Sequence, residues 1–231
     1  MRHGVAPIIL NGDPLPWVDH LGSLLQSDNS MRSDCLIKKA QFIGKVNSLL
    51  QEFHYVDSNV MVRILEIYVT SFYGSCLWDL YSAEVTRIYS SWNVTMRNVF
   101  NLPWTSHRYL IESVSSTRHP KTMLSSRLVR FWDSLRKCKK NSVRYLFSLV
   151  YDDKRTLTGR TASRIASDCG VERTVLDWRQ ATNVRYFPPP PGELWRIPLL
   201  QELLEVRKGN VTIPGVDQED IKSIIDEICS H

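Results

Sequence analysis

Cysteines are few and scattered in this sequence. There are five, an odd number, and no two have the spacing of ligands in a zinc knuckle. An odd number of cysteines without a regular spacing also argues against a small secreted domain that is cross-linked by disulfides. We therefore expect free thiols and a reducing compartment. The cysteines are Cys35, Cys76, Cys138, Cys169 and Cys229.

Long apolar runs are also lacking. The most apolar stretch, residues 60–69, is interrupted by Arg63 and Glu66 and is too short to cross a bilayer. The first residues lack the apolar core of a secretion signal. We accordingly expect no membrane partner and a nuclear or cytoplasmic protein that is not secreted.

The common signatures of enzymes are missing as well. The sequence has no glycine-rich phosphate loop and no Gly-x-Ser-x-Gly elbow. His54, His107 and His119 have no partners at the spacing of metal ligands, and His107 is expected to pack or cap a helix. Cys138 lies among basic residues, but no base can be named for it. We predict no catalytic, cofactor-binding or metal-binding residue.

The distribution of charge is the most informative feature that is present. The chain of 231 residues has ordinary globular proportions, with 43% hydrophobic and 23% charged residues, and a net charge of +5. Residues 118–164 hold thirteen basic and three acidic residues, and the remainder holds 16 basic and 21 acidic residues. A basic middle between acidic flanks is typical of a surface that binds a polyanion. The alternative is a solvated helix surface.

Hydrophobic periodicity predicts a mainly α fold with a short N-terminal β-hairpin. Asn11-Gly12 between apolar runs favours a hairpin over residues 8–18, and residues 21–25 could add a third strand. Four consecutive prolines make residues 187–192 an extended linker. Apolar residues at helical spacing predict helices near residues 33–50, 58–77, 84–100, 105–114, 120–138, 142–150, 161–167, 194–206 and 217–229.

Four tryptophans lie in these predicted helices or beside them. Bases can stack on an exposed indole. Because most of the four fall on apolar helix faces, we instead expect them to pack in the core. They are Trp78, Trp92, Trp104 and Trp132.

Several motifs, in their order and spacing over about residues 5–170, resemble the C-terminal part of non-LTR retrotransposon reverse transcriptases of the jockey and CR1 type. No one motif is specific, and the resemblance rests on their succession. The motifs are Leu10-Asn11-Gly12 with Leu15-Pro16-Trp17-Val18, His20-Leu21-Gly22, Tyr73-Gly74-Ser75-Cys76-Leu77-Trp78, Trp92-Asn93 with Arg97, Leu102-Pro103-Trp104-Thr105-Ser106-His107 with Leu110, and the stretch 141–159.

The resemblance implies a division of the chain into five segments. Residues 1–25 would be a remnant of the palm hairpin and its Leu-Gly block, and residues 26–115 a thumb-like helical bundle. A basic post-thumb region (116–186), the proline-rich linker (187–192) and an acidic helical tail (193–231) would follow. His20, Leu21 and Gly22 would correspond to the primer grip. Asp19 departs from the lysine usual in the family, and its carboxylate would repel a primer phosphate.

The resemblance also implies what this chain cannot do. The parent family is an RNA-directed DNA polymerase that uses Mg²⁺ held by palm aspartates. Those aspartates would precede Leu10, and the nine residues there include no acid. Tyr151-Asp152-Asp153 resembles the metal motif only superficially, and a surface turn explains it better. We therefore expect a polymerase fragment that is inactive by itself and holds no cofactor.

A thumb binds a template–primer through charge and shape without reading sequence. The resemblance makes Lys38, Lys39 and Lys45 the candidate thumb contacts, although simple solvation of a polar helix face also explains them. A second set would bind RNA, an RNA–DNA hybrid or DNA, and its run at 136–140 could alternatively serve nuclear import. This set is Arg127, Arg130, Arg136, Lys137, Lys139, Lys140 and Arg144.

A different class of function remains open. The tail carries eight acids against four bases, and Ile221, Ile224, Ile225 and Ile228 share one helix face. The chain could therefore be a non-enzymatic interaction module that docks a protein partner through its C-terminal helix.

Overall fold

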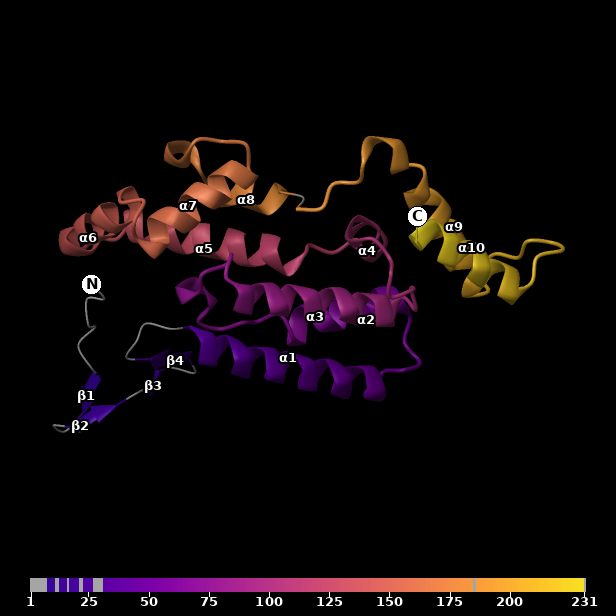
Figure 1. Cartoon of the computed structure of the whole chain (residues 1–231), viewed down its shortest axis with the longest axis horizontal. Coiled ribbons are helices and arrows are strands. Elements are labelled where there is room, and N and C mark those ends of the chain that lie inside the picture. The colour runs from indigo at the N-terminus through magenta and orange to yellow at the C-terminus, as the bar shows by residue number, and fades with distance from the viewer. Residues whose placement is uncertain are drawn as a thin grey trace. The chain divides into compact units, whose positions relative to one another are not determined.

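The computed structural model describes residues 31–184 and 186–230 in full, and this part of the chain is mainly helical (Figure 1). The predicted helical class is thus confirmed. Before residue 31 it gives only the backbone of four short strands, β1 (Ile8–Leu10), β2 (Asp13–Leu15), β3 (Trp17–His20) and β4 (Ser23–Gln26). The predicted turn, Asn11-Gly12, lies outside the described residues, so the N-terminal hairpin stays a prediction.

The described residues form ten α-helices and three 3₁₀ turns, joined by loops. The helices are α1 (Arg32–Glu52), α2 (Ser58–Tyr68), α3 (Ala83–Val99), α4 (Arg108–Ser115), α5 (Pro120–Arg136), α6 (Asn141–Asp152), α7 (Leu157–Asp168), α8 (Trp178–Asn183), α9 (Arg196–Arg207) and α10 (Gln218–Ser230). The 3₁₀ turns are η1 (Ser75–Leu77), η2 (Arg173–Val175) and η3 (Pro191–Glu193).

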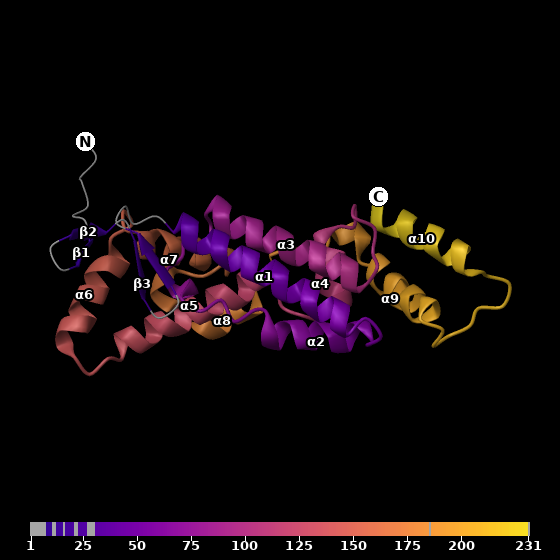
Figure 2. The same ribbon diagram turned by 90° about the horizontal axis from the view of Figure 1, so that it is seen from below.

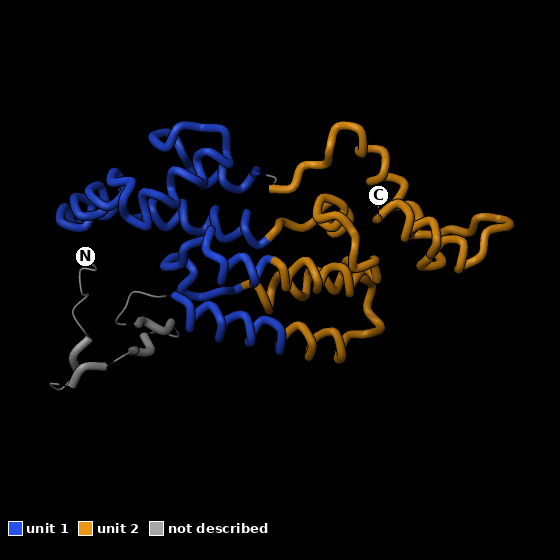
Figure 3. The backbone as a smooth tube through the Cα atoms, viewed as in Figure 1, with its two compact units in different colours: residues 1–44, 71–89, 120–184 blue, residues 45–70, 90–119, 185–231 orange. Residues whose placement is uncertain are grey.

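The helices belong to two compact units, each built from three separate segments (Figure 3). Unit 1 comprises residues 1–44, 71–89 and 120–184, and unit 2 comprises residues 45–70, 90–119 and 185–231. The boundary falls inside α1 and inside α3. The units therefore follow tertiary packing and do not coincide with the five consecutive segments expected from the sequence.

Local capping chemistry explains where several helices begin. Asp57 caps α2 by accepting a hydrogen bond from the Asn59 amide at 2.8 Å. Pro120 opens α5, where its missing N–H costs nothing. Asp177 and Gln180 form a reciprocal capping box at the start of α8, a short helix that the periodicity did not predict.

The predicted helix over residues 58–77 ends early, at Tyr68. The backbone reverses beyond it, because Phe72 (φ 30°) and Gly74 (φ 82°) both adopt left-handed conformations. Glycine takes this conformation without steric cost. The Tyr-Gly-Ser segment is therefore a tight turn that leads into η1, and not a kinked helix.

The buried face of α1 differs from the apolar stripe whose helical spacing predicts this helix. That stripe consists of Leu36, Ile37, Ala40, Ile43, Val46, Leu49 and Leu50. Leu36, Ile37 and Ile43 are 44%, 46% and 40% exposed, whereas Cys35, Phe42 and Val46 are buried. The predicted stripe is therefore wrong for these three exposed residues. The buried face of α1 is narrow and includes the carboxylate of Asp34.

Unit 1 is held by a buried polar contact between α1 and the residue after η1. The indole Nε1 of Trp78 donates to Asp34 Oδ2 at 2.7 Å, and both side chains are buried. The ring of Phe72 lies 5.9 Å from that of Trp78 and 5.9 Å from that of Phe42. η1 also packs against α5. Trp78 thus connects the N-terminal helix to the centre of the unit.

The long helix α5 is the scaffold of unit 1, and α8 packs along it. Ser126 lies 2.6 Å from the Thr182 hydroxyl, and Thr122 donates to the Val184 carbonyl at 3.2 Å. α6 also packs on α5, and α7 packs on α6.

The predicted core positions Trp78 and Trp132 of this unit are buried, as is Trp92 in unit 2. Trp104 is 85% exposed, so its predicted burial is wrong.

Unit 2 contains the antiparallel pair α9 and α10, which lie side by side (Figures 1 and 2). Ile221, Ile225 and Ile228 are buried in this unit, and only Ile224 of the predicted stripe is 38% exposed.

The proline-rich stretch is not extended throughout, because Pro191–Glu193 forms the turn η3. Pro198 lies in the first turn of α9, where proline is tolerated.

The contact between Asp34 and Trp78 generates a prediction about stability. Trp78→Phe should lower the free energy of unfolding by about 1–3 kcal/mol more than Trp132→Phe, because it leaves a buried carboxylate short of a donor. Trp132 is equally buried in the same unit, and no hydrogen bond from its indole is found among the described residues. Urea unfolding measures both variants. Equal destabilisation would show that the hydrogen bond contributes nothing.

Candidate nucleic-acid interface

Four of the predicted nucleic-acid contacts meet where α5 ends and α6 begins. Lys137, Lys139 and Lys140 occupy the turn between the two helices and are exposed, and Arg144 is exposed in the second turn of α6. We call these four residues the basic corner, and Figure 2 shows the turn between α5 and α6 where they lie. The sequence holds no acid between Asp133 and Asp152, and Asp133 already pairs with Arg136 at 3.0 Å. None of the salt bridges found among the described residues includes a side chain of this corner, so its positive charge is not compensated within that part of the chain.

The start of α6 lacks the side chains that usually stabilise the N-terminus of a helix. Its N-cap residue is Lys140, which makes no side-chain capping hydrogen bond, and its first turn contains no acid. The N-terminus of a helix carries a partial positive charge and unpaired amides, so cations destabilise it and anions stabilise it. The corner thus concentrates lysine ammonium groups at a helix end that favours a phosphate.

An exposed aromatic side chain lies beside these cations. Tyr145 follows Arg144 directly and is 64% exposed, and Leu146 and Leu149 on the same helix are 60% and 51% exposed. Aromatic rings next to basic side chains are the platform on which unpaired bases stack. The surface of α6 therefore offers both the charge and the stacking surface for a nucleic-acid strand.

Three other arginines of the predicted set are used inside unit 1. The Arg127 guanidinium donates to the Ser71 carbonyl at 3.1 Å, and burial lowers its pKa. Arg130 lies 4.4 Å from the ring centre of Trp178, and Arg136 lies 4.4 Å from that of Tyr151. The structure therefore separates Arg127, Arg130 and Arg136 from the four exposed cations of the basic corner. The three arginines contact a carbonyl or an aromatic ring inside unit 1, whereas Arg144 of the corner donates to the neighbouring Asn141 side chain.

The remaining predicted contacts are not joined to this corner. Lys39 is half-buried on α1 and Lys45 is exposed, while Lys38 has partners of its own within the protein. His20, Leu21 and Gly22 lie outside the residues whose side chains the structure describes. The primer-grip prediction for them stays a prediction.

The Tyr151-Asp152-Asp153 segment ends α6 and forms the turn before α7. Tyr151 is buried and donates to the Arg173 carbonyl at 2.9 Å, and Asp153 pairs with Arg155 at 3.0 Å. The hydrogen bonds from Arg155 hold the pKa of Asp153 below its usual value. A Cβ on Gly159 would lie 2.2 Å from the Asp153 carbonyl oxygen, so the helices approach closely here. Asp153 accepts hydrogen bonds from the amide and the guanidinium of Arg155 in this turn, whereas Asp152 lies at the end of α6, 3.9 Å from Arg173.

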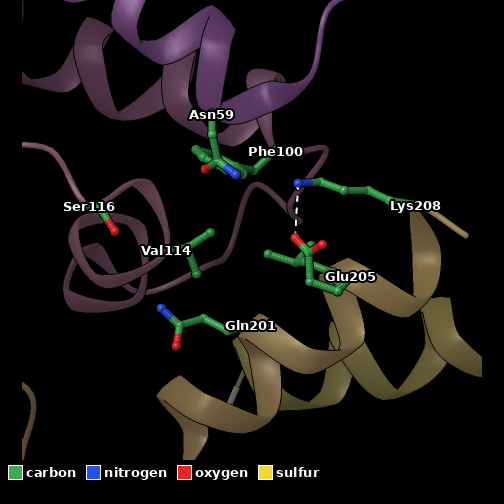
Figure 4. Close-up of a pocket in the computed structure, with 8 residues that line it drawn as sticks. Asn59, Phe100, Val114, Ser116, Gln201, Glu205 and Lys208 are labelled. Carbon is green, nitrogen blue, oxygen red and sulfur yellow. Dashed lines mark hydrogen bonds and ion pairs between the residues drawn. The ribbon is translucent and has the colours of Figure 1, made fainter. Parts of the chain in front are cut away.

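A small cavity of about 230 Å³ lies in unit 2 between α2, the loop after α4, and α9 (Figure 4). Lys208 reaches across its edge and pairs with Asp57 at 2.9 Å and with Glu205 at 3.1 Å. Although burial disfavours the ammonium, these hydrogen bonds raise the pKa of Lys208 and lower that of Asp57. The charged groups at this cavity are already paired with one another. Lys208, Asp57 and Glu205 therefore form a structural clasp, as we call this cluster.

No group of His, Cys, Asp and Glu suited to a metal ion occurs among the described residues. Within the same part of the chain, no helix has the length and apolar character needed to cross a membrane. His107 stands at the N-cap of α4 without capping it, and its ring stacks on Tyr109 with centroids 5.6 Å apart.

Comparison of the chain with protein families, with curated proteins and with solved structures finds no match. The likeness to reverse transcriptases consequently rests on the sequence motifs alone.

Sequence reasoning missed one further group of polar residues. Arg97, Arg108 and Glu193 converge on a second cavity in unit 2, together with Phe187 from the proline-rich stretch. They are distant in sequence and share no spacing signal. Of these residues, Arg97 alone belongs to a motif of the sequence resemblance. The four prolines of residues 187–192 indicate a linker and give no sign that this stretch lines a cavity.

The clasp at Lys208 predicts a stability that depends on pH. The folded pKa of Asp57 lies below its usual 3.8, so this carboxylate stabilises the fold above that pH and loses the effect as the pH falls further. We expect Lys208→Met to lower the urea midpoint at pH 7 and to approach the wild type below pH 3.8. Lys222→Met, at an exposed position of α10, is the matched control. A pH-independent difference would contradict the ion pair.

Proposed function

We propose that this chain binds the sugar–phosphate backbone of nucleic acid through the basic corner, without reading sequence. The observation that carries the proposal is the charge of Lys137, Lys139, Lys140 and Arg144 at the uncapped start of α6, which no salt bridge among the described residues neutralises. Phosphates neutralise such a cluster and release counterions from the nucleic acid, which drives association.

The chemistry of the corner supports backbone contact over base recognition. Lysine is a flexible point charge, whereas base edges are read by bidentate groups such as arginine and asparagine. Arg144 is the only arginine of the corner, and it is hydrogen-bonded to Asn141. Tyr145 adds a stacking surface that tolerates every base. We therefore favour RNA or single-stranded segments as ligands, with little preference for sequence.

The sequence resemblance extends this proposal to an origin. We infer that the chain is the thumb and post-thumb part of an RNA-directed DNA polymerase of the non-LTR retrotransposon type, and that residues 8–18 are the end of its palm. By itself it would bind a template–primer and polymerise nothing. Lys38, Lys39 and Lys45 would then be secondary contacts along α1. A nucleic-acid ligand agrees with the nuclear or cytoplasmic location expected from the sequence.

The alternative function, docking of a partner by the C-terminal helix, has less support. Three of the four isoleucines that would form the docking stripe are buried within unit 2. A partner could reach them only if α10 left α9. Binding through exposed cations requires no such rearrangement.

Binding to a fluorescent RNA oligonucleotide tests the proposal. In the triple variant Lys137→Gln, Lys139→Gln, Lys140→Gln, the slope of log K against log salt should fall by roughly 0.7 per lost contact with a single strand. Affinity at low salt should decrease at least tenfold, since each contact adds an electrostatic gain. Fluorescence anisotropy at several salt concentrations measures both quantities.

A second triple variant, Arg63→Gln, Arg179→Gln, Lys222→Gln, removes the same charge from other exposed positions. It should keep the wild-type slope if the corner is the site. Equal losses of affinity and of salt slope in both triple variants would mean that net charge alone attracts the RNA. Wild-type binding that does not respond to salt would eliminate the proposed interface.

A further inference from the structure

The second cavity of unit 2 has the composition of an anion site. Its volume is about 570 Å³, within the range typical of pockets for small organic ligands. One wall is formed by Arg97 on α3 and by the residues at the start of α4. The rest of the lining comes from the segment 186–193, which includes the Phe187 ring.

Two guanidinium groups in this cavity lack a carboxylate partner among the described residues. Arg97 donates to the Ser106 carbonyl at 2.6 Å, while its Nε is buried and makes no hydrogen bond to the residues that the structure describes. Arg108 lies over the Phe187 ring at 5.2 Å. Burial, and then the charge of Arg108, lower the pKa of Arg97. An anion between the two guanidinium groups would offset the repulsion between them and favour the charged form of Arg97.

The carboxylate that lines this cavity is already occupied. Glu193 accepts a hydrogen bond from the Tyr109 hydroxyl and lies 3.7 Å from the guanidinium of Arg196. Burial and the bond to Glu193 raise the pKa of Tyr109 to about 12, so the phenol keeps its proton. Because Arg196 offsets the charge of Glu193, the positive charge of Arg97 and Arg108 predominates.

The start of α4 adds a third contribution. His107 is its N-cap residue and makes no side-chain capping hydrogen bond, and the first turn contains no acid. The first amides of a helix are donors without helical partners, and the helix dipole favours an anion beside them. A phosphate next to Arg108 would therefore meet backbone donors as well as guanidinium groups.

We propose that this cavity binds a nucleoside monophosphate, with its phosphate between Arg97 and Arg108 and its base along the wall that contains Phe187. Arginine forks are suited to the oxygens of a phosphate, and an aromatic ring is suited to a base. The cavity is much larger than a bare phosphate needs. This site is separate from the basic corner and does not depend on it.

Isothermal titration of the full chain with AMP tests the proposal, with inorganic phosphate and adenosine as comparison ligands. AMP should bind saturably and at least tenfold more tightly than either, since each of these makes only part of the contacts. The triple variant of the basic corner should bind AMP as the wild type does. No saturable AMP binding up to about 10 mM, near the weak limit of specific affinity, would overturn the proposal.

Arg108→Gln is the decisive variant, because this side chain is exposed and its loss should leave the fold intact. Loss of a charged hydrogen-bond donor should weaken AMP binding roughly tenfold or more. Arg63→Gln, at an exposed position elsewhere in unit 2, should bind AMP unchanged. Unchanged binding by Arg108→Gln, or inorganic phosphate binding as tightly as AMP, would refute the assignment.

Discussion

The hydrogen bond between the Trp78 indole and the Asp34 carboxylate is the contact on which unit 1 depends. A buried carboxylate is costly unless donors surround it, so it fixes the position of whatever supplies them. Here the donor follows η1, which packs against α5, and α5 ends at the basic corner. The orientation of the proposed nucleic-acid surface is therefore linked, through η1 and α5, to a buried polar contact within the same unit.

Arginine and lysine have different roles in the basic middle of the chain. Arg127, Arg130 and Arg136 bind a backbone carbonyl, stack on aromatic rings or pair with an acid, all within unit 1. Guanidinium groups are planar and weakly hydrated, which suits them to such contacts. The lysines of the corner remain in water, as ammonium groups prefer. A count of positive charges in the sequence therefore overestimates the surface that is available to a polyanion.

The sequence predicted the helical class and most helix positions, because apolar spacing and capping residues act locally. The predictions from sequence failed where tertiary packing determines which residues are buried. Leu36, Ile37 and Ile43 look like a core stripe, but the fold buries the face of Phe42 and leaves these three exposed. Trp104 is exposed although it is aromatic and lies two residues after the buried Leu102. The basic corner was predictable because its cations are adjacent in the chain. The cavity of unit 2 was not, since Arg97 and Phe187 are joined only by folding.

The close approach at Gly159 has a consequence for recognising relatives of this chain. The Asp153 carbonyl oxygen occupies the space that any side chain at position 159 would need, so the α6–α7 turn admits only glycine there. Thr156 accepts a hydrogen bond from the same glycine amide and fixes the spacing between the two positions. Threonine followed three residues later by glycine is thus a steric signature, and a distant sequence that folds with this turn should retain it even where the basic residues have changed.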